Sequence, residues 1–208
     1  MARRIEQISR KRKNRNFKKC ILVNYEGKDN KTEELYFNNF QNRDKDYYIK
    51  VLCCNVTDPV KMIEALIKYV KNQKIDKYDN YKVFCIFDTD VSVEKQPRID
   101  QAIKLAEANN IETIISAPCF EIWFREHFKY TRRSYYSNEE LIKDLRKFIP
   151  QYEKNKNIYD FIKDKTNLAV LNCKQLEKEQ VENGYRLNTV ECNPYTSVYK
   201  IIEYLNTE

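Results

Sequence analysis

Glycine is nearly absent from this chain of 208 residues, which holds only Gly27 and Gly184. A phosphate-binding loop and a dinucleotide-binding loop each need several glycines within one short segment, because their backbone must approach the phosphates closely. The sequence therefore excludes Walker-type nucleotide hydrolysis and Rossmann-type redox chemistry.

Histidine, paired cysteines and long apolar runs are also scarce. His127 is the single histidine, which excludes a multi-histidine metal site, and no serine lies in a nucleophile-elbow motif. The seven cysteines show no C-x-x-C spacing, so we expect reduced, mostly buried thiols and no zinc site. No apolar run is long enough to span a bilayer, and the basic N-terminus lacks the apolar stretch of a secretory signal. We therefore expect a cytoplasmic protein that does not associate with membranes.

Positive charge is concentrated at the N-terminus. The first twenty residues carry nine basic residues and one acidic residue, a net charge of +8, whereas the whole chain carries +7. The densest part of this arm is Arg10, Lys11, Arg12 and Lys13. Such an arm suits the phosphate backbone of a nucleic acid, although a solubilising, disordered terminus accounts for it equally well. We interpret residues 1–19 as an arm and residues 20–208 as one domain.

Apolar segments alternate with amphipathic segments over residues 20–128, the core of that domain. Strands are predicted at Cys20–Tyr25, Tyr47–Cys54, Tyr81–Phe87 and Ile111–Ser116. Helices are predicted from Thr32 as a cap, after the cap Asp58, and over Ile99–Ala108. This alternation predicts an α/β fold, a parallel sheet flanked by helices.

The strand pattern disappears beyond Pro118, and residues 129–208 are predicted to form a helical C-terminal portion. The helical segments expected after Pro118 are Cys119–Phe128, Asn138–Phe148, Ile158–Val181, with a break near Thr166, and Tyr195–Leu205.

Acidic residues follow two of the predicted strands. Glu26 comes directly after the first strand and Asp88 directly after the third, and Asp90 lies two residues further on. Ligands bind beyond the carboxyl ends of parallel strands, and an extended segment would point Asp88 and Asp90 the same way. Carboxylates gathered there repel one another unless a cation joins them, which favours one or two Mg²⁺ or Mn²⁺ ions. The alternative is that all three are ordinary turn and cap residues.

These acidic residues also belong to motifs that resemble the Toprim domain of topoisomerases, primases and OLD-family nucleases. In chain order the motifs are Glu26-Gly27, Thr32-Glu33-x-x-Tyr36-Phe37 and Asp88-x-Asp90. The resemblance implies a Toprim-like (Rossmann-like) sheet and a metal-dependent enzyme. The link between Gly27 and Thr32 is longer than in related Toprim nucleases, which leaves open whether Glu33 or Glu34 is the second acidic residue.

Later motifs make the resemblance more specific, because the chain is similar to the RloB-like family over nearly everything after residue 20. These motifs are Ser116-Ala-Pro-Cys-Phe-Glu121-x-Trp123-Phe124-x-x-His127-Phe128 and Asn193-Pro-x-Thr196. That family is associated with restriction-modification loci and abortive phage infection. The resemblance implies a Mg²⁺- or Mn²⁺-dependent nuclease that cuts RNA, for instance transfer RNA, or DNA as an anti-phage defence effector.

Carried over by motif, the resemblance implies roles for several carboxylates. Glu26 would be a metal ligand or general base, and Asp88 and Asp90 would be metal ligands. Glu33 would support the first metal or bind a second, and Glu121 is a further acidic candidate. With two metals, one ion would activate water and the other would stabilise the leaving oxygen.

Each remaining candidate has a structural alternative. His127 could transfer a proton, but the aromatic residues at helical spacing beside it equally predict a buried histidine with a structural hydrogen bond. Lys154 and Lys156 lie in a polar connection, where a lysine could neutralise a substrate phosphate or simply be solvated. Asn193 is predicted to cap the last helix, and both Asn193 and Thr196 are candidates for substrate contact.

Two other functions fit the same fold. We allow for a homo-oligomer whichever function holds. One alternative function is a non-catalytic nucleic-acid-binding or sensor subunit of a defence complex, which depends on a partner ATPase. The other is a primase- or topoisomerase-like enzyme. Topoisomerase action needs a domain with a nucleophilic tyrosine, and 208 residues leave little room for one.

Overall fold

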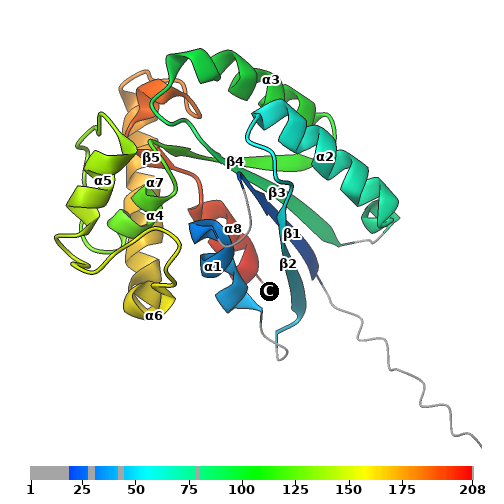
Figure 1. Ribbon diagram of the computed structural model, residues 1–208, viewed down its shortest axis with the longest axis horizontal. Coiled ribbons are helices and arrows are strands. Elements are labelled where there is room, and N and C mark those ends of the chain that lie inside the picture. Colours follow the sequence, from blue (N-terminus) through cyan, green and yellow to red (C-terminus); the bar gives the residue numbers. More distant parts are fainter. Residues whose placement is uncertain (1–18, 28–30, 42–44, 78–79, 208) are drawn as a thin grey trace, which may run out of the picture.

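Five strands form one sheet in the order β2-β1-β3-β4-β5 (Figure 1). The computed structural model describes residues 19–27, 31–41, 45–77 and 80–207, so the arm residues Arg10, Lys11, Arg12 and Lys13 lie outside the described residues. Strands β1 to β4 are parallel, and β5 is antiparallel to β4. The strand bounds are β1 Lys19–Tyr25, β2 Tyr47–Cys53, β3 Tyr81–Asp88, β4 Ile111–Ala117 and β5 Tyr195–Thr196. The predicted α/β fold with a mostly parallel sheet is confirmed.

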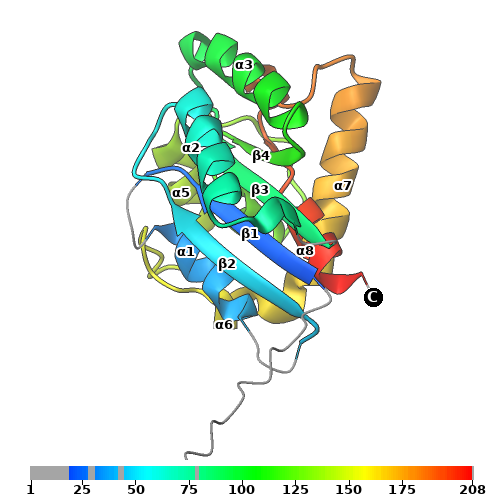
Figure 2. The same cartoon turned by 90° about the vertical axis from the view of Figure 1, so that its right-hand side faces the viewer.

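Helices cover both faces of this sheet (Figures 1 and 2). Helices α2 Pro59–Asn72 and α3 Gln96–Glu107 cover one face. The helices on the opposite side or beyond the β5 edge are α1 Thr32–Phe37, α4 Glu121–Glu126, α5 Asn138–Leu145, α6 Tyr159–Ile162, α7 Thr166–Glu182 and α8 Tyr199–Asn206. None of the helices in the described part of the chain has both the length and the apolar character that a membrane crossing requires.

Strand β3 shows why the strands of this sheet appear in the sequence as uninterrupted apolar segments. Its residues Val83, Cys85 and Phe87 belong to the core beneath α2 and α3, whereas Phe84 and Ile86 belong to the opposite core. All five side chains are at most 1% exposed. A parallel strand covered on both faces therefore needs apolar residues at every position rather than at every second one.

Helix starts were predicted with mixed success. Asp58 caps α2 as expected, because its carboxylate accepts a hydrogen bond of 2.9 Å from the backbone N–H of Lys61, and Pro59 is the first helical residue. The prediction that Thr32 caps α1 was wrong. Helix α1 begins at Thr32 itself, Lys31 holds the cap position without a side-chain hydrogen bond, and the Thr32 hydroxyl donates to Glu121 instead.

The C-terminal portion is largely helical, but its last segment differs from the prediction. The break near Thr166 is confirmed, because a short 3₁₀ turn over Lys163–Lys165 separates α6 from α7. The predicted helix from Tyr195 is instead the short strand β5 followed by α8. Two residues are too few to show strand periodicity, and only their pairing with β4 makes them a strand.

Asn193 does not cap that last helix, so this prediction was wrong as well. Its side-chain amide donates a hydrogen bond of 2.6 Å to the backbone carbonyl of Tyr135 and accepts one of 3.2 Å from the Tyr135 N–H. Asn193 thus ties the segment before β5 to the segment before α5, and helix α8 begins after Val198 without a side-chain cap.

A buried hydroxyl pair joins β5 to the parallel sheet. Thr196 pairs with Ser116 of β4, and their hydroxyl oxygens are 2.9 Å apart with both side chains fully buried. The Thr196 hydroxyl also accepts a hydrogen bond from the backbone N–H of Val198. Thr196 therefore contributes its hydroxyl to the attachment of the C-terminal segment.

Replacing Thr196 by valine keeps the side-chain shape but leaves the Ser116 hydroxyl buried without its partner. We expect Thr196→Val to lower the free energy of unfolding by about 1–2 kcal/mol in urea denaturation. Adding Ser116→Ala removes the second partner, so the double variant should lose little more than the single one. Losses that simply add would contradict a coupled pair.

Candidate functional site

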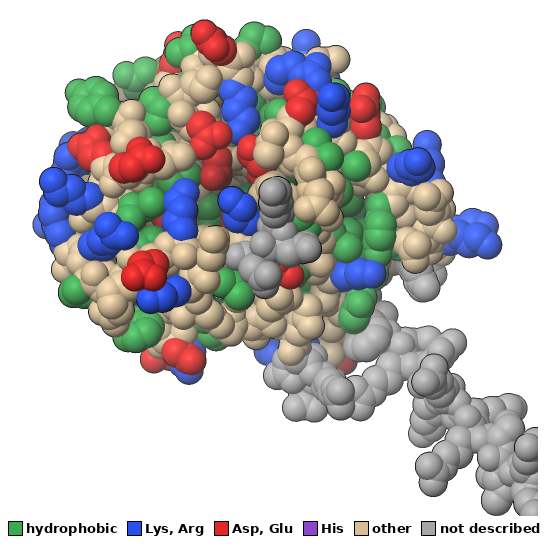
Figure 3. Space-filling model, in the orientation of Figure 1, with side chains coloured by type: hydrophobic (Ala, Val, Ile, Leu, Met, Phe, Trp, Pro, Cys, Tyr) green, Lys and Arg blue, Asp and Glu red, His purple; other side chains and the backbone are tan. Residues whose placement is uncertain are grey.

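A cavity of about 160 Å³ lies at the carboxyl edge of the parallel strands. Five carboxylates from four segments of the chain line it: Glu26, Glu33, Asp88, Asp90 and Glu121. In the space-filling view, acidic side chains gather near the middle of this side of the molecule, with lysine and arginine side chains beside them (Figure 3). The structure therefore brings together all five acidic residues that the sequence analysis selected.

The ends of β1 and β3 deliver three of these acids. Tyr25 is the last residue of β1, which places Glu26 at the edge, and Asp88 is the last residue of β3. Asp90 reaches the cavity in a different way from the one predicted, because its φ of 52° is left-handed rather than extended. The backbone N–H of Asp90 donates to the carbonyl of Pro118, which holds this turn against the end of β4.

Helices α1 and α4 supply the other two acids. Glu33 lies in the first turn of α1 and is 7% exposed, and Glu121 begins α4 and is 2% exposed. The Glu121 carboxylate accepts a hydrogen bond of 3.0 Å from the hydroxyl of Tyr152. Glu34 turns away from the cavity, since its carboxylate accepts a hydrogen bond of 2.6 Å from the hydroxyl of Tyr25. Of this pair, Glu33 therefore lines the cavity and Glu34 does not.

Lysines offset the charge of these acids: Lys31 and Lys154 line the cavity, and Lys95 binds two of its carboxylates. The Lys95 ammonium lies 2.8 Å from a carboxylate oxygen of Asp90 and 3.1 and 3.3 Å from the two oxygens of Glu26. The Lys154 ammonium lies 3.9 Å from Glu121. Asn138, at the start of α5, donates a hydrogen bond of 3.0 Å to the other oxygen of Asp90.

Two acids of the cavity, Asp88 and Glu33, hold their protons more tightly than usual. Burial raises the pKa of Asp88 well above its usual range, and the charges of Glu33 and Glu121 raise it further. Burial, together with the charge of Glu121, raises the pKa of Glu33 to about 7. Asp90 behaves oppositely: burial works to raise its pKa, but the ammonium of Lys95 outweighs burial and holds it below its usual value.

The donor set of the cavity fits a hard divalent cation. Asp88 supplies the clearest sign, because its buried Oδ1 atom has no hydrogen-bond partner within the described residues. Carboxylate oxygens are the ligands that Mg²⁺ and Mn²⁺ accept. However, in the described part of the chain no three acidic, cysteine or histidine side chains stand close enough together to hold a metal as they lie. The cavity therefore has suitable ligand types, but the carboxylate oxygens of the described residues are not close enough together to bind one ion.

Other predicted site residues lie elsewhere. His127 is fully buried beside Trp123, with Nδ1 2.8 Å from the Trp123 carbonyl oxygen, and burial lowers the histidine pKa to about 4. Lys156 is exposed and pairs with Glu153 at 2.8 Å. His127, Lys156, Asn193 and Thr196 do not line the acidic cavity. The structural alternative stated for His127 matches its surroundings.

The sequence analysis missed Lys95 and Asn138. Lys95 comes five residues after Asp90 in a polar segment, and Asn138 starts an ordinary amphipathic helix. No periodicity or motif marks either residue, because only the left-handed turn after β3 and the placement of α5 bring them to Asp90.

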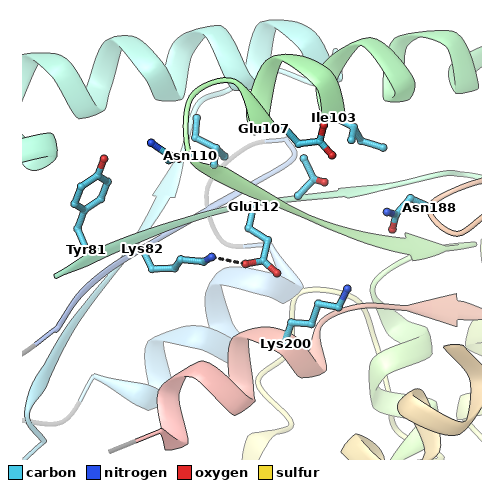
Figure 4. Close-up of a pocket in the computed structure, with 10 residues that line it drawn as sticks. Tyr81, Lys82, Ile103, Glu107, Asn110, Glu112, Asn188 and Lys200 are labelled. Carbon is cyan, nitrogen blue, oxygen red and sulfur yellow. Dashed lines mark ion pairs between the residues drawn. The ribbon is translucent and has the colours of Figure 1, made fainter. Parts of the chain in front are cut away.

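A larger cavity of about 520 Å³ lies at the opposite, amino-terminal edge of β3 and β4 (Figure 4). Its acids differ from those of the first cavity, because Glu112 forms an ion pair of 2.6 Å with Lys82 and both side chains are about one-third exposed. Paired, partly solvated charges of this kind balance each other without a metal. Because Lys82 and Glu112 do not line the acidic cavity, they are suitable control positions.

The fold and the acidic cavity define an α/β protein whose candidate site lies at the carboxyl edge of a mostly parallel sheet. Residues 21–205 match the family model described as RloB-like protein. The chain therefore belongs to the RloB-like family, as its motifs implied. No curated protein and no solved structure matches it.

Glu126, which lies outside the acidic cavity, should make the stability of the fold depend on pH. Its side chain is fully buried, and burial raises its pKa from the usual 4.5 to about 8 although the nearby charge of Arg125 opposes this. The folded state therefore holds this proton more tightly than the unfolded state. The resulting stability is complete below about pH 4.5 and is lost as the pH rises through about 8.

We expect Glu126→Gln to reduce this decline. The free energy of unfolding of the unmodified protein should fall by a few kcal/mol between about pH 5 and pH 9, and the variant should fall by less. Urea denaturation across that range measures both slopes. Equal slopes in the unmodified protein and in the Glu126→Gln variant would contradict the assignment.

Proposed function

We propose that this protein is a Mg²⁺- or Mn²⁺-dependent nuclease that hydrolyses phosphodiester bonds of RNA or DNA. The observation that carries the proposal is the gathering of five carboxylates in one cavity, with the unpartnered Oδ1 of Asp88 among them. A fold gains nothing from carboxylates that raise one another's pKa, so a bound cation is the natural explanation for their placement. The Toprim-like order of the motifs supports the same reaction.

Glu26, Asp88 and Asp90 would hold the metal, and Glu33 and Glu121 lie across the cavity where they could hold a second ion. A bound ion would activate water and stabilise the charge that develops on the phosphate. Lys154 is about half exposed at the rim, where its ammonium can contact a substrate phosphate while remaining close to Glu121. Asn138 orients Asp90 by its hydrogen bond.

The proposal also includes the nucleic acid that is cleaved and the biological role of the cleavage. The basic arm would add phosphate contacts without sequence preference, which suits both RNA, including transfer RNA, and DNA. The resemblance to restriction-associated families supports a cytoplasmic role in anti-phage defence. A toxic nuclease must be restrained, so a partner ATPase is a natural source of control.

A second function is favoured by the same cavity. No three potential ligands within the described residues stand close enough to hold a metal as they lie. A nucleic-acid-binding or sensor subunit that never cleaves would need no such convergence. Metal-dependent cleavage by the purified chain separates the two functions.

Asp88→Asn tests the nuclease most cleanly. The fold holds this carboxyl with a raised pKa, so the neutral amide should leave folding intact. We expect Mg²⁺- or Mn²⁺-dependent cleavage of labelled transfer RNA, single-stranded RNA or plasmid DNA, and a loss of about a hundredfold or more in the variant. EDTA should abolish cleavage, whereas Glu112→Gln should retain it. Cleavage that persists in Asp88→Asn would refute the site, and no cleavage by any protein would favour the binding subunit.

Lys154→Met tests the phosphate contact separately. Removing the rim ammonium should lower kcat/KM by about tenfold to a hundredfold while metal binding persists, because this lysine is not a ligand. Lys156→Met, at a neighbouring exposed lysine, should have little effect. Equal losses in both variants would show that the segment contributes only general positive charge.

A further inference from the structure

Lys95 occupies the position between Glu26 and Asp90 where the proposed metal would be expected. Its ammonium lies within 3.3 Å of three carboxylate oxygens, two from Glu26 and one from Asp90. The side chain is 16% exposed, so the ammonium is held in the site rather than extended into solvent. The acids on this side of the cavity are thus already neutralised by a residue of the chain.

The position of Lys95 along the chain allows it to leave. Lys95 ends a 3₁₀ turn over Val93–Lys95, which follows the left-handed residues Asp90 and Val91, and both Val93 and Glu94 are exposed. Its four-carbon stem can therefore swing outward without removing an apolar side chain from the core. By contrast, Glu26 and Asp88 are fixed at the ends of two central strands.

We propose that Lys95 is an internal cation that closes the acidic site and that a divalent metal must displace it. This inference rests on the proposed function, because it assumes that Glu26 and Asp90 are metal ligands. A divalent ion and an ammonium cannot both lie between the same carboxylates, because their charges repel at that distance. The open site is then only a fraction of the population, and the apparent metal affinity is reduced by that fraction.

The same displacement accounts for two observations that otherwise conflict. The cavity has the ligand types that a metal needs, yet its oxygens have not converged on one point. With Lys95 in place, Glu26 and Asp90 are held toward the ammonium, at 3.1 and 2.8 Å, and the buried Oδ1 of Asp88 has no hydrogen-bond partner within the described residues. Departure of Lys95 would free two carboxylates to face Asp88.

Mn²⁺ titration of full-length protein by calorimetry, without substrate, tests the displacement. We expect Lys95→Met to bind Mn²⁺ about tenfold more tightly than the unmodified protein, which corresponds to Lys95 closing about nine of ten sites. Lys95→Arg should not bind more tightly, because it keeps a cation there. Lys82→Met, an equal charge loss at the opposite edge, should bind like the unmodified protein.

Lys154→Met is the control for local charge, since it removes a cation from the same cavity but not from between Glu26 and Asp90. An equal gain in affinity in Lys154→Met and Lys95→Met would overturn the proposal. So would unchanged or weaker binding by Lys95→Met when the unmodified protein binds. Absence of Mn²⁺ binding in every protein would overturn the proposed metal function as well, so the two failures are distinguishable.

Chemical labelling of the unmodified protein provides a second readout that needs no variant. Lys95 should react slowly with an amine-acetylating reagent while it is held by two carboxylates, and several-fold faster once saturating Mn²⁺ displaces it. Peptide mass spectrometry compares Lys95 with Lys82, whose labelling should not change. Equal labelling of Lys95 with and without bound Mn²⁺ would overturn the proposal.

Discussion

Mutual repulsion among buried carboxylates is the constraint on which the rest of the site depends. Asp88 ends a central strand with one oxygen buried, and Glu33 and Glu121 raise its pKa from the helices opposite. Lysine ammonium groups offset this repulsion, because Lys95 pairs with Glu26 and Asp90 and both Lys31 and Lys154 act on Glu33. Binding of a divalent cation would relieve the same repulsion. The relief of this repulsion would make the free energy of metal binding more favourable.

The pairing of neighbouring strands brings these acids together. Parallel strands end at one edge, so β1 and β3 bring Glu26 and Asp88 together, and Ser116, the partner of Asp88 in β4, carries the hydroxyl that anchors β5. Attachment of β5 in turn fixes the C-terminal helices that close the far side of the sheet.

The sequence predicted the parts of the site that depend on strand ends and failed where side chains meet through tertiary packing. Glu26, Asp88 and Asp90 could be placed at one edge because apolar runs stop just before them. The orientation of Asp90 was wrong, since a left-handed turn has no apolar signature, and Glu33 could be chosen over Glu34 only once Tyr25 was seen to bind Glu34. Strand β5 and Lys95 were missed because only tertiary contacts define them.

The central claim is that the acidic cavity holds a divalent metal. A crystal structure with Mn²⁺, with anomalous scattering recorded at the manganese edge, tests it most directly. The account predicts an anomalous peak bounded by Glu26, Asp88 and Asp90, with the Lys95 ammonium moved away. A well-ordered cavity without a peak at saturating Mn²⁺, and with Lys95 still between Glu26 and Asp90, would contradict it.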